Sequence, residues 1–303
     1  MFDKILKLVG FLLFIMACFL IKKEVDFIGI DPLKKALFSV SNSALIEGVC
    51  MLFINYFILS FYDVLGLFYI RKRICYRDVF FMSSSSFAIS NLTGHTYLSG
   101  YVTRYIFLKP FGVHKKEVLY LVYFISIAVL LGLVASFILA MFLEISTGVL
   151  TSYKHLPLLY LFTFLLIIGV QFYFKEIVDK KRSLPFGKII FKAPTKEISF
   201  YQVLVGLLDF MTFFGVFYIF LSHFISCSFI PVFVVFSVSM AIAYLSQVPA
   251  GLGILESSFL ILYQHTPSDK AYILSAFILF RLLYYVLPFL LFTPLIFVFR
   301  KKK

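Results

Sequence analysis

Residues 118–143, VLYLVYFISIAVLLGLVASFILAMFL, contain no Asp, Glu, Lys or Arg. An α-helix crosses the roughly 30 Å hydrocarbon core of a bilayer with about 20 apolar residues, so this stretch can span a membrane. Further apolar stretches of similar length lie at residues 5–21, 44–65, 156–174, 203–222, 229–248 and 272–299. We therefore expect an all-α, polytopic membrane protein with about six to eight transmembrane helices. Because no loop is long enough for a soluble domain, residues 1–303 are expected to form a single integral membrane domain.

The composition excludes other classes of protein. Of the 303 residues, 62% are hydrophobic and 14% are charged, whereas a soluble domain has about 45–50% apolar and about 25% charged residues. Four cysteines in a chain of this length are too few for a disulfide scaffold. The first span follows Lys4 and Lys7 and has no small-residue cleavage site, so we expect an uncleaved anchor. Asp31 and Pro32 are typical of a helix start, and residues 31–41 are expected to lie flat on the membrane surface.

Two stretches do not have the sequence of ordinary spans. Residues 80–108, FFMSSSSFAISNLTGHTYLSGYVTRYIFL, are long enough to cross but are rich in polar groups that are costly in lipid. Their polar or flexible positions include Asn91, Gly94, His95, Gly100 and Arg104. In residues 249–264, the helix is interrupted by Pro249, Gly251 and Gly253. Irregular backbone at membrane depth is tolerated where it is buried in protein or lines a cavity. Both stretches therefore predict re-entrant or broken-helix elements, as found in transporters.

The basic residues favour one topology. The chain carries a formal net charge of +13, and Lys and Arg gather in the cytoplasmic loops of membrane proteins. If residues 80–108 and 229–264 are both re-entrant and both termini are cytoplasmic, 21 basic residues lie inside and 6 outside. A model in which residues 80–108 cross gives 19 inside and 8 outside, so the preference is narrow. Since topology explains the charge, we expect no nucleic-acid partner.

Ionisable side chains inside the apolar stretches need an explanation, because each costs about 2.5–3.5 kcal/mol on insertion scales. These residues are Glu47, Asp63, Arg104, Asp209, Glu256 and Arg281. One interpretation is that acids and bases neutralise one another between helices and only fix the packing. The other is that Arg104 and Arg281 flank a polar cavity and bind a headgroup phosphate, which guanidinium groups match in a bidentate way.

The functional interpretation adds further residues to the predicted site. A half-helix starting after Gly253 would point its free N–H groups toward the same anion, and Glu256 lies in its first turn as a cap, an arginine partner or a proton carrier. His95 is the histidine in a polar break and could contact substrate or carry a proton. The histidines show no metal-ligand spacing, and no known catalytic or phosphate-loop motif is present, so we expect no cofactor, no metal and no enzymatic activity.

Four segments, in order along the chain, carry a family resemblance. Residues 245–256, LSQVPAGLGILE, resemble the SHVPGGLGxxE signature of the flippase-like family, also called the lysylphosphatidylglycerol synthase transmembrane region, which includes the YbhN-like inner-membrane proteins. Ser99-Gly100 followed by Arg104-Tyr105, Leu208-Asp209, and residues 279–288 with Arg281 and Tyr284-Tyr285 resemble its SGxxxRY, SxLDW and YRxxYYxxP segments. Gln247, Ala250 and Phe210 depart from the pattern, and the aminoacyl-transferase domain of the synthases has no counterpart in these residues.

The resemblance implies translocation of phospholipid or of a lipid-linked anionic substrate, or lipid homeostasis, in the bacterial inner membrane. The alternatives are a non-transporting scaffold for envelope or lipid-synthesis enzymes and, less favoured, a lipid-modifying enzyme. We expect membrane lipids, above all anionic phospholipid, as partners, and the oligomeric state stays open. The residues predicted to bind the headgroup are Arg104, Arg281, Glu256, Asp209, His95, Asn91, Tyr105 and Tyr285. The positions predicted to break helices are Pro249, Gly251, Gly253, Gly94 and Gly100.

Overall fold

A computed structural model describes residues 31, 34, 38–93, 96–186, 189–246, 248–263 and 269–294. The predicted span 5–21, most of the helix expected at 31–41, and the positions Gly94, His95 and Gln247 lie outside the described residues. The helices are α3 (Asn42–Tyr69), α4 (Tyr76–Thr93), α5 (Thr96–Leu108), α6 (Lys115–Thr147), α7 (Leu156–Phe172), α8 (Lys196–Phe224), α9 (Phe229–Leu245), α10 (Ile254–Leu262), α11 (Asp269–Arg281) and α12 (Leu287–Phe292). A π-helical turn, Leu282–Val286, joins α11 to α12.

The expected class, a polytopic α-helical membrane protein, is confirmed. Within the described residues, five helical stretches are long and apolar enough to cross a membrane, namely Asn42–Tyr69, Lys115–Thr147, Leu156–Val178, Lys196–Phe224 and Asp269–Phe292. Three of them, α3, α6 and α8, begin before the predicted apolar spans because capped polar turns start them. The Ser41 hydroxyl accepts the Ala44 N–H at the start of α3, and the Glu117 side chain accepts the His114 N–H at the start of α6.

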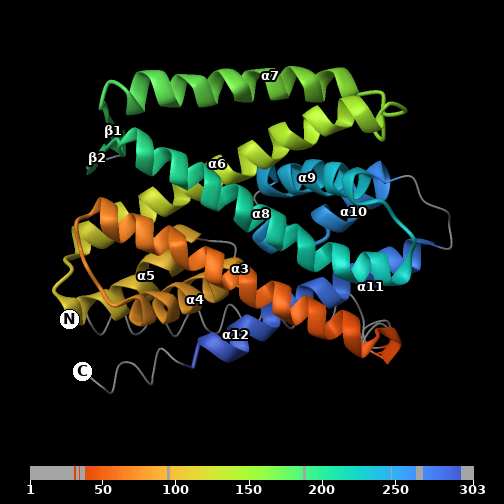
Figure 1. Ribbon diagram of the computed structural model, residues 1–303, viewed down its shortest axis with the longest axis horizontal. Helices are drawn as coiled ribbons and strands as arrows, with labels where there is room; N and C mark the ends of the chain where they lie inside the picture. The colour runs from red at the N-terminus through yellow and green to blue at the C-terminus, as the bar shows by residue number, and fades with distance from the viewer. Residues whose placement is uncertain are drawn as a thin grey trace.

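Contacts between helix ends define two ends of the molecule. Lys72, just after α3, pairs with Glu117 in the first turn of α6 at 3.1 Å. The Tyr69 hydroxyl, at the end of α3, donates to the Lys192 carbonyl just before α8 at 2.6 Å. We call this the basic end; in Figure 1 it lies at the left, beside the label of β1. At the opposite end, the Ser41 N–H before α3 donates to His223 near the end of α8, so α3 and α8 run antiparallel.

Residues 76–108 form a re-entrant hairpin. Because α3 ends and α6 begins at the basic end, the segment between them must enter and leave on one side. Helices α4 and α5 pack against each other and against α3 and α6, respectively (Figure 1). The predicted broken-helix element in residues 80–108 is confirmed as two packed helices, α4 and α5, and that it does not cross the membrane stays a prediction.

Residues 229–262 form a second helical hairpin, which begins at the opposite end. Tyr218 of α8 donates to the Cys227 carbonyl just before α9, and the rings of Phe224 and Tyr272 stack at 6.1 Å, so α9 and α11 both begin at the end where α8 finishes. The turn between α9 and α10 contains three residues in left-handed conformations: Ala250 (φ 54°), Gly251 (φ 62°) and Gly253 (φ 74°). Helix α9 therefore stops at Leu245, and the apolar run 229–248 is half of a hairpin rather than a full span.

One element departs from the all-α expectation. The basic segment between α7 and α8 contains a two-stranded antiparallel sheet of β1 (Ser183–Phe186) and β2 (Ile189–Lys192). Two four-residue strands joined by a two-residue connection give too short a pattern to stand out in a polar loop. The hairpin lies at the basic end (Figure 1).

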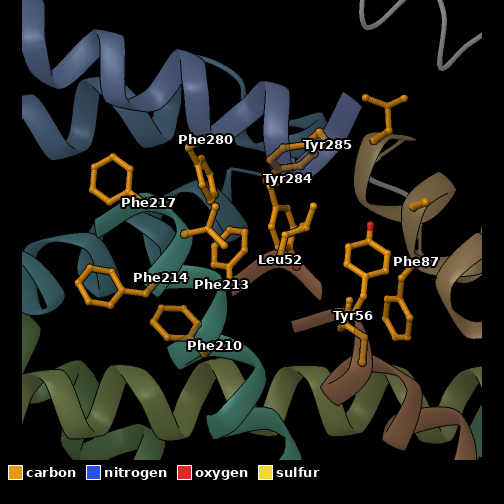
Figure 2. Close-up of a cluster of buried hydrophobic side chains, with 14 of the residues drawn as sticks. Leu52, Tyr56, Phe87, Phe210, Phe213, Phe214, Phe217, Phe280, Tyr284 and Tyr285 are labelled. Atoms are coloured by element: carbon orange, nitrogen blue, oxygen red, sulfur yellow. The ribbon is translucent and has the colours of Figure 1, made fainter. Parts of the chain in front are cut away.

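The core is built around α8. Figure 2 shows Phe213 of this helix beside Phe280 and Tyr284, which come from the last long helical stretch, and Phe217 also contacts Phe280. Phe210 and Phe214 pack instead against Phe233 and Phe236 of α9. The Phe213 and Tyr284 rings lie 4.6 Å apart in an edge contact, a favourable geometry for aromatic pairs. The ring contacts between α8 and α9 link the second hairpin to this aromatic core.

Candidate functional site

Arg104 is the most deeply buried basic residue of the predicted site. Its Nε and Nη2 atoms donate to Oδ1 and Oδ2 of Asp63 at 2.7 and 2.8 Å, and neither side chain is exposed. The pair joins α5 of the first hairpin to the spanning helix α3. Such a bidentate contact satisfies both carboxylate oxygens, and arginine stays charged because it cannot lose its proton in a protein.

The surroundings of Arg104 explain Gly100. The sequence predicted a helix break at this glycine, but Gly100 lies inside α5. A Cβ there would be 2.8 Å from Nη1 of Arg104, so glycine leaves room for the guanidinium group rather than breaking the helix. The guanidinium carbon also lies 5.0 Å from the centre of the Phe87 ring, a cation–π contact.

Arg281 closes the second hairpin. Its Nε donates to Oε1 of Glu256 in the first turn of α10. Its Nη1 and Nη2 donate to the carbonyl oxygens of Ala250 and Gly251 at 3.2 and 3.3 Å. The guanidinium therefore holds together the carbonyls of the irregular turn and the helix that follows it. Its carbon lies 5.6 Å from the centre of the Tyr285 ring.

The half-helix α10 begins at Ile254, directly after Gly253, and has Glu256 in its first turn. The second carboxylate oxygen of Glu256, Oε2, is buried and has no hydrogen-bond partner among the described residues. A buried polar atom without a partner costs about 1–3 kcal/mol, and more when it is charged. The Arg281–Glu256 pair is therefore less completely satisfied than the Arg104–Asp63 pair.

Asp209 of α8 forms a third polar cluster. Asn55 of α3 donates from Nδ2 to Oδ1 of Asp209 at 2.9 Å, and the Tyr62 hydroxyl donates to Oδ2 at 3.0 Å. Nδ2 of Asn55 also contacts Thr212, and Oδ1 of Asn55 accepts the Tyr284 hydroxyl at 2.9 Å. Asn55 thus connects α3, α8 and the π-helical turn, and Asp209 is held by neutral donors rather than by a cation.

The remaining predicted residues lie around these clusters. Tyr105 is buried and its ring stacks on Tyr101 at 6.1 Å, while Tyr285 is buried beside Arg281. Asn91 is half-buried near the end of α4. The backbone at Pro249 starts the irregular turn before α10. No group of three or more His, Cys, Asp or Glu side chains that could hold a metal is found within the described residues.

The comparisons with known proteins decide the family. Residues 7–291 match the family model described as the lysylphosphatidylglycerol synthase transmembrane region. The chain belongs to this family. Two relatives align with nearly its whole length. The uncharacterized protein slr0712 of Synechocystis sp. is 26% identical over 287 residues, covering 92% of this chain and 87% of the relative. The inner membrane protein YbhN of Escherichia coli is 25% identical over 295 residues, covering 95% and 89%.

In this member of the lysylphosphatidylglycerol synthase transmembrane region family, the sequence does not predict the polar partners of Arg104 and Asp209. The sequence marks Asp63 as a charged residue within a span, but no local pattern connects it with Arg104 in particular. Asn55, a polar residue in the middle of an apolar run, carried a signal that could have been followed, because amides at membrane depth are rare without a partner. Tyr62 and Tyr284 carried none, since tyrosines abound in this chain.

Proposed function

We propose that this multi-pass membrane protein moves phospholipid or a lipid-linked anionic substrate between the leaflets of the bacterial inner membrane. The basic end would face the cytoplasm, because lysine and arginine of membrane proteins gather on that side. In this proposal, the two half-crossing hairpins form the barrier between the leaflets, and the arginine–carboxylate pairs keep that barrier closed.

The observation that carries the proposal is that each hairpin is tied to a spanning helix by an arginine–carboxylate pair, completely buried for Arg104–Asp63 and largely buried for Arg281–Glu256. A phosphate group offers guanidinium the same bidentate geometry as a carboxylate, so an anionic headgroup can compete for the arginine. Exchange of partners would loosen the hairpin at the moment the headgroup enters. A buried charge would then remain paired at each stage, which limits the cost of the charged intermediate.

Two other observations support a moving element rather than a static plug. Glu256 retains an unpartnered buried oxygen, and the turn before α10 holds Ala250 in a left-handed conformation that costs an L-residue roughly 1–2 kcal/mol. The π-helical turn Leu282–Val286 directly follows Arg281, and such turns are frequent at functional sites. Strain and an incomplete hydrogen-bond set at one hairpin are the features expected of a switch between two packings.

A leaflet-resolved transport assay tests this proposal. The full chain is reconstituted in vesicles that contain NBD-labelled phosphatidylglycerol, and dithionite bleaches the label in the outer leaflet. We expect the inner-leaflet label to become accessible faster than in protein-free vesicles, and faster for phosphatidylglycerol than for labelled phosphatidylcholine. Equal rates with and without protein would overturn translocation and favour the non-transporting scaffold. If the protein is a scaffold, a variant with residues 175–202 replaced would fail to complement a strain that lacks the gene. Variants with the arginines changed would still complement that strain.

A further inference from the structure

A pocket of about 990 Å³ opens at the basic end, away from the two arginine–carboxylate pairs. Its walls come from three segments: the end of α3 with the turn that follows it, the start of α6, and the residues that lead into α8. In Figure 1 these segments meet near the β1–β2 hairpin. The volume lies at the upper end of the roughly 300–1,000 Å³ typical of ligand sites.

The lining of this pocket is strongly basic. Four cationic side chains, Arg71, Lys72, Arg73 and Lys192, face one acid, Glu117. Lys72 and Glu117 pair with each other at 3.1 Å, which leaves the charge of the other three uncompensated. Arg71 and Arg73 form no ion pair with any described residue. A phosphate-bearing group would supply the missing negative charge.

This excess differs from the ordinary accumulation of cytoplasmic lysine and arginine. Three basic side chains between α7 and the start of α8 have acidic partners: Lys180 and Arg182 both pair with Glu176, and Lys196 pairs with Asp179. The same end of the molecule therefore contains both neutralised and unneutralised cations, and three of the unneutralised ones gather in the lining of the pocket.

The backbone at Arg71 adds a second observation. Its φ of 59° is left-handed, and the N–H of Lys72 returns to the Leu67 carbonyl at 2.9 Å, the pattern of a helix end that normally uses glycine. Arginine at this position is less favourable for the fold than glycine. The chain thus keeps a guanidinium beside the pocket at some cost to stability.

We propose that this pocket binds the phosphate-bearing headgroup of an anionic phospholipid from the leaflet at the basic end. Apolar and aromatic side chains accompany the cations in the lining: Phe68, which is 70% exposed, Tyr69, Tyr120 and Ile198. A free phosphate has no apolar group that could contact this surface. A phospholipid would place its glycerol and upper acyl chain against the apolar side chains while the cations bind its phosphate. Binding in this pocket is independent of the proposed translocation, because it requires no movement of lipid between leaflets.

Calorimetric titration of the full chain in a neutral detergent tests the site. The probes are short-chain phosphatidylglycerol, short-chain phosphatidylcholine, glycerol phosphate and inorganic phosphate. We expect Arg71→Gln/Arg73→Gln to weaken phosphatidylglycerol binding roughly 30-fold, at about fivefold for each basic side chain near a membrane surface. The matched control, Lys180→Gln/Arg182→Gln, removes the same charge at the same end and should leave the affinity unchanged.

A second variant separates binding from folding. Arg71→Gly removes one guanidinium where the backbone suits glycine, so its melting temperature should equal or exceed that of the wild type while affinity falls about fivefold. Equal losses in the pocket and control variants would overturn the site in favour of general surface charge. Glycerol phosphate or inorganic phosphate binding as tightly as phosphatidylglycerol would overturn the lipid and assign the pocket to a soluble phosphate compound.

Discussion

At the scale of single residues, the buried arginines dictate what surrounds them. Arg104 is completely enclosed and cannot neutralise itself by losing a proton, so the fold must supply an anion. Asp63 provides it through both carboxylate oxygens. Such a pair contributes little net stability, because desolvation offsets attraction, but breaking it leaves an unpaired buried charge. This asymmetry makes the pair a sensitive point in the structure.

The asymmetry leads to a prediction about stability. Asp63→Asn should lower the free energy of unfolding by about 3–5 kcal/mol, because Arg104 then stays buried without an anion. The double variant Asp63→Asn/Arg104→Gln should recover most of that loss. Unfolding of the purified protein by a denaturing detergent measures both. Glu176, a partly exposed acid that pairs with Lys180, serves as the control, and Glu176→Gln should leave the transition nearly unchanged. A double variant as unstable as the single one would contradict this account.

At the scale of helices, α8 is positioned by one close crossing. A Cβ built on Gly132 of α6 would lie 2.4 Å from the Cα of Gly206 on α8, closer than any real side chain is found. Small residues at such crossings allow helix backbones to approach in a membrane. The crossing fixes α8, which in turn carries Asp209 and the aromatic core.

Substitution of these glycines tests the crossing. Gly132→Ala should destabilise the protein by about 1–3 kcal/mol, since the two backbones must separate. Gly169 of α7 has nothing within 4 Å of its built Cβ, so Gly169→Ala should leave stability unchanged or raise it by up to about 1 kcal/mol. Detergent unfolding curves of the two variants distinguish a specific contact from a general effect of removing glycine. Similar curves for both would show that the crossing is not close.

The Asn55 cluster offers a graded test of how α3 is tied to α8. Tyr62→Phe removes one hydrogen bond to Asp209, whereas Asn55→Ala removes the contacts to Asp209, Thr212 and Tyr284 together. We expect a cost of about 1–2 kcal/mol for the first variant and a clearly larger one for the second. Unfolding free energies in the reverse order would contradict the bridging role of Asn55.

The sequence predicted the two hairpins but not their partners. Polar groups in residues 80–108 and the Pro249–Gly253 break are local signals, and a local signal can be read from the chain directly. The partners depend on helix packing: Arg104 meets Asp63 across 41 residues, and Asn55 meets Asp209 across 154. Apolar spans face both lipid and protein, so their pattern does not reveal which faces meet. For the same reason, the sequence predicted a helix break at Gly100, whereas this glycine lies within α5 and leaves room for the guanidinium group of Arg104.

At the scale of the whole molecule, the hairpins decide which loops share a side of the membrane. In a chain whose other cysteines are replaced by serine, Cys75 alone and Lys116→Cys alone should react with a membrane-impermeant maleimide from the same side. Lys154→Cys and Lys270→Cys should both react from the opposite side. Labelling in intact cells and in inverted vesicles measures this. Opposite sides for Cys75 and Lys116→Cys would mean that residues 76–108 cross the membrane.

The central claim is that the two buried arginine pairs control the movement of anionic lipid. The most direct measurement is the rate of NBD-labelled phosphatidylglycerol translocation in vesicles containing Asp63→Asn/Arg104→Gln or Glu256→Gln/Arg281→Gln. In each double variant both members of the pair become neutral, so no unpaired charge stays in the core. We predict that each moves the lipid at least about tenfold more slowly than the wild type, because the headgroup phosphate loses its guanidinium partner. The size of the effect is that of one lost hydrogen-bonding contact between charged groups. The exposed pair variant Glu176→Gln/Lys180→Gln should match the wild type. Folded pair variants that transport at the wild-type rate would contradict the claim.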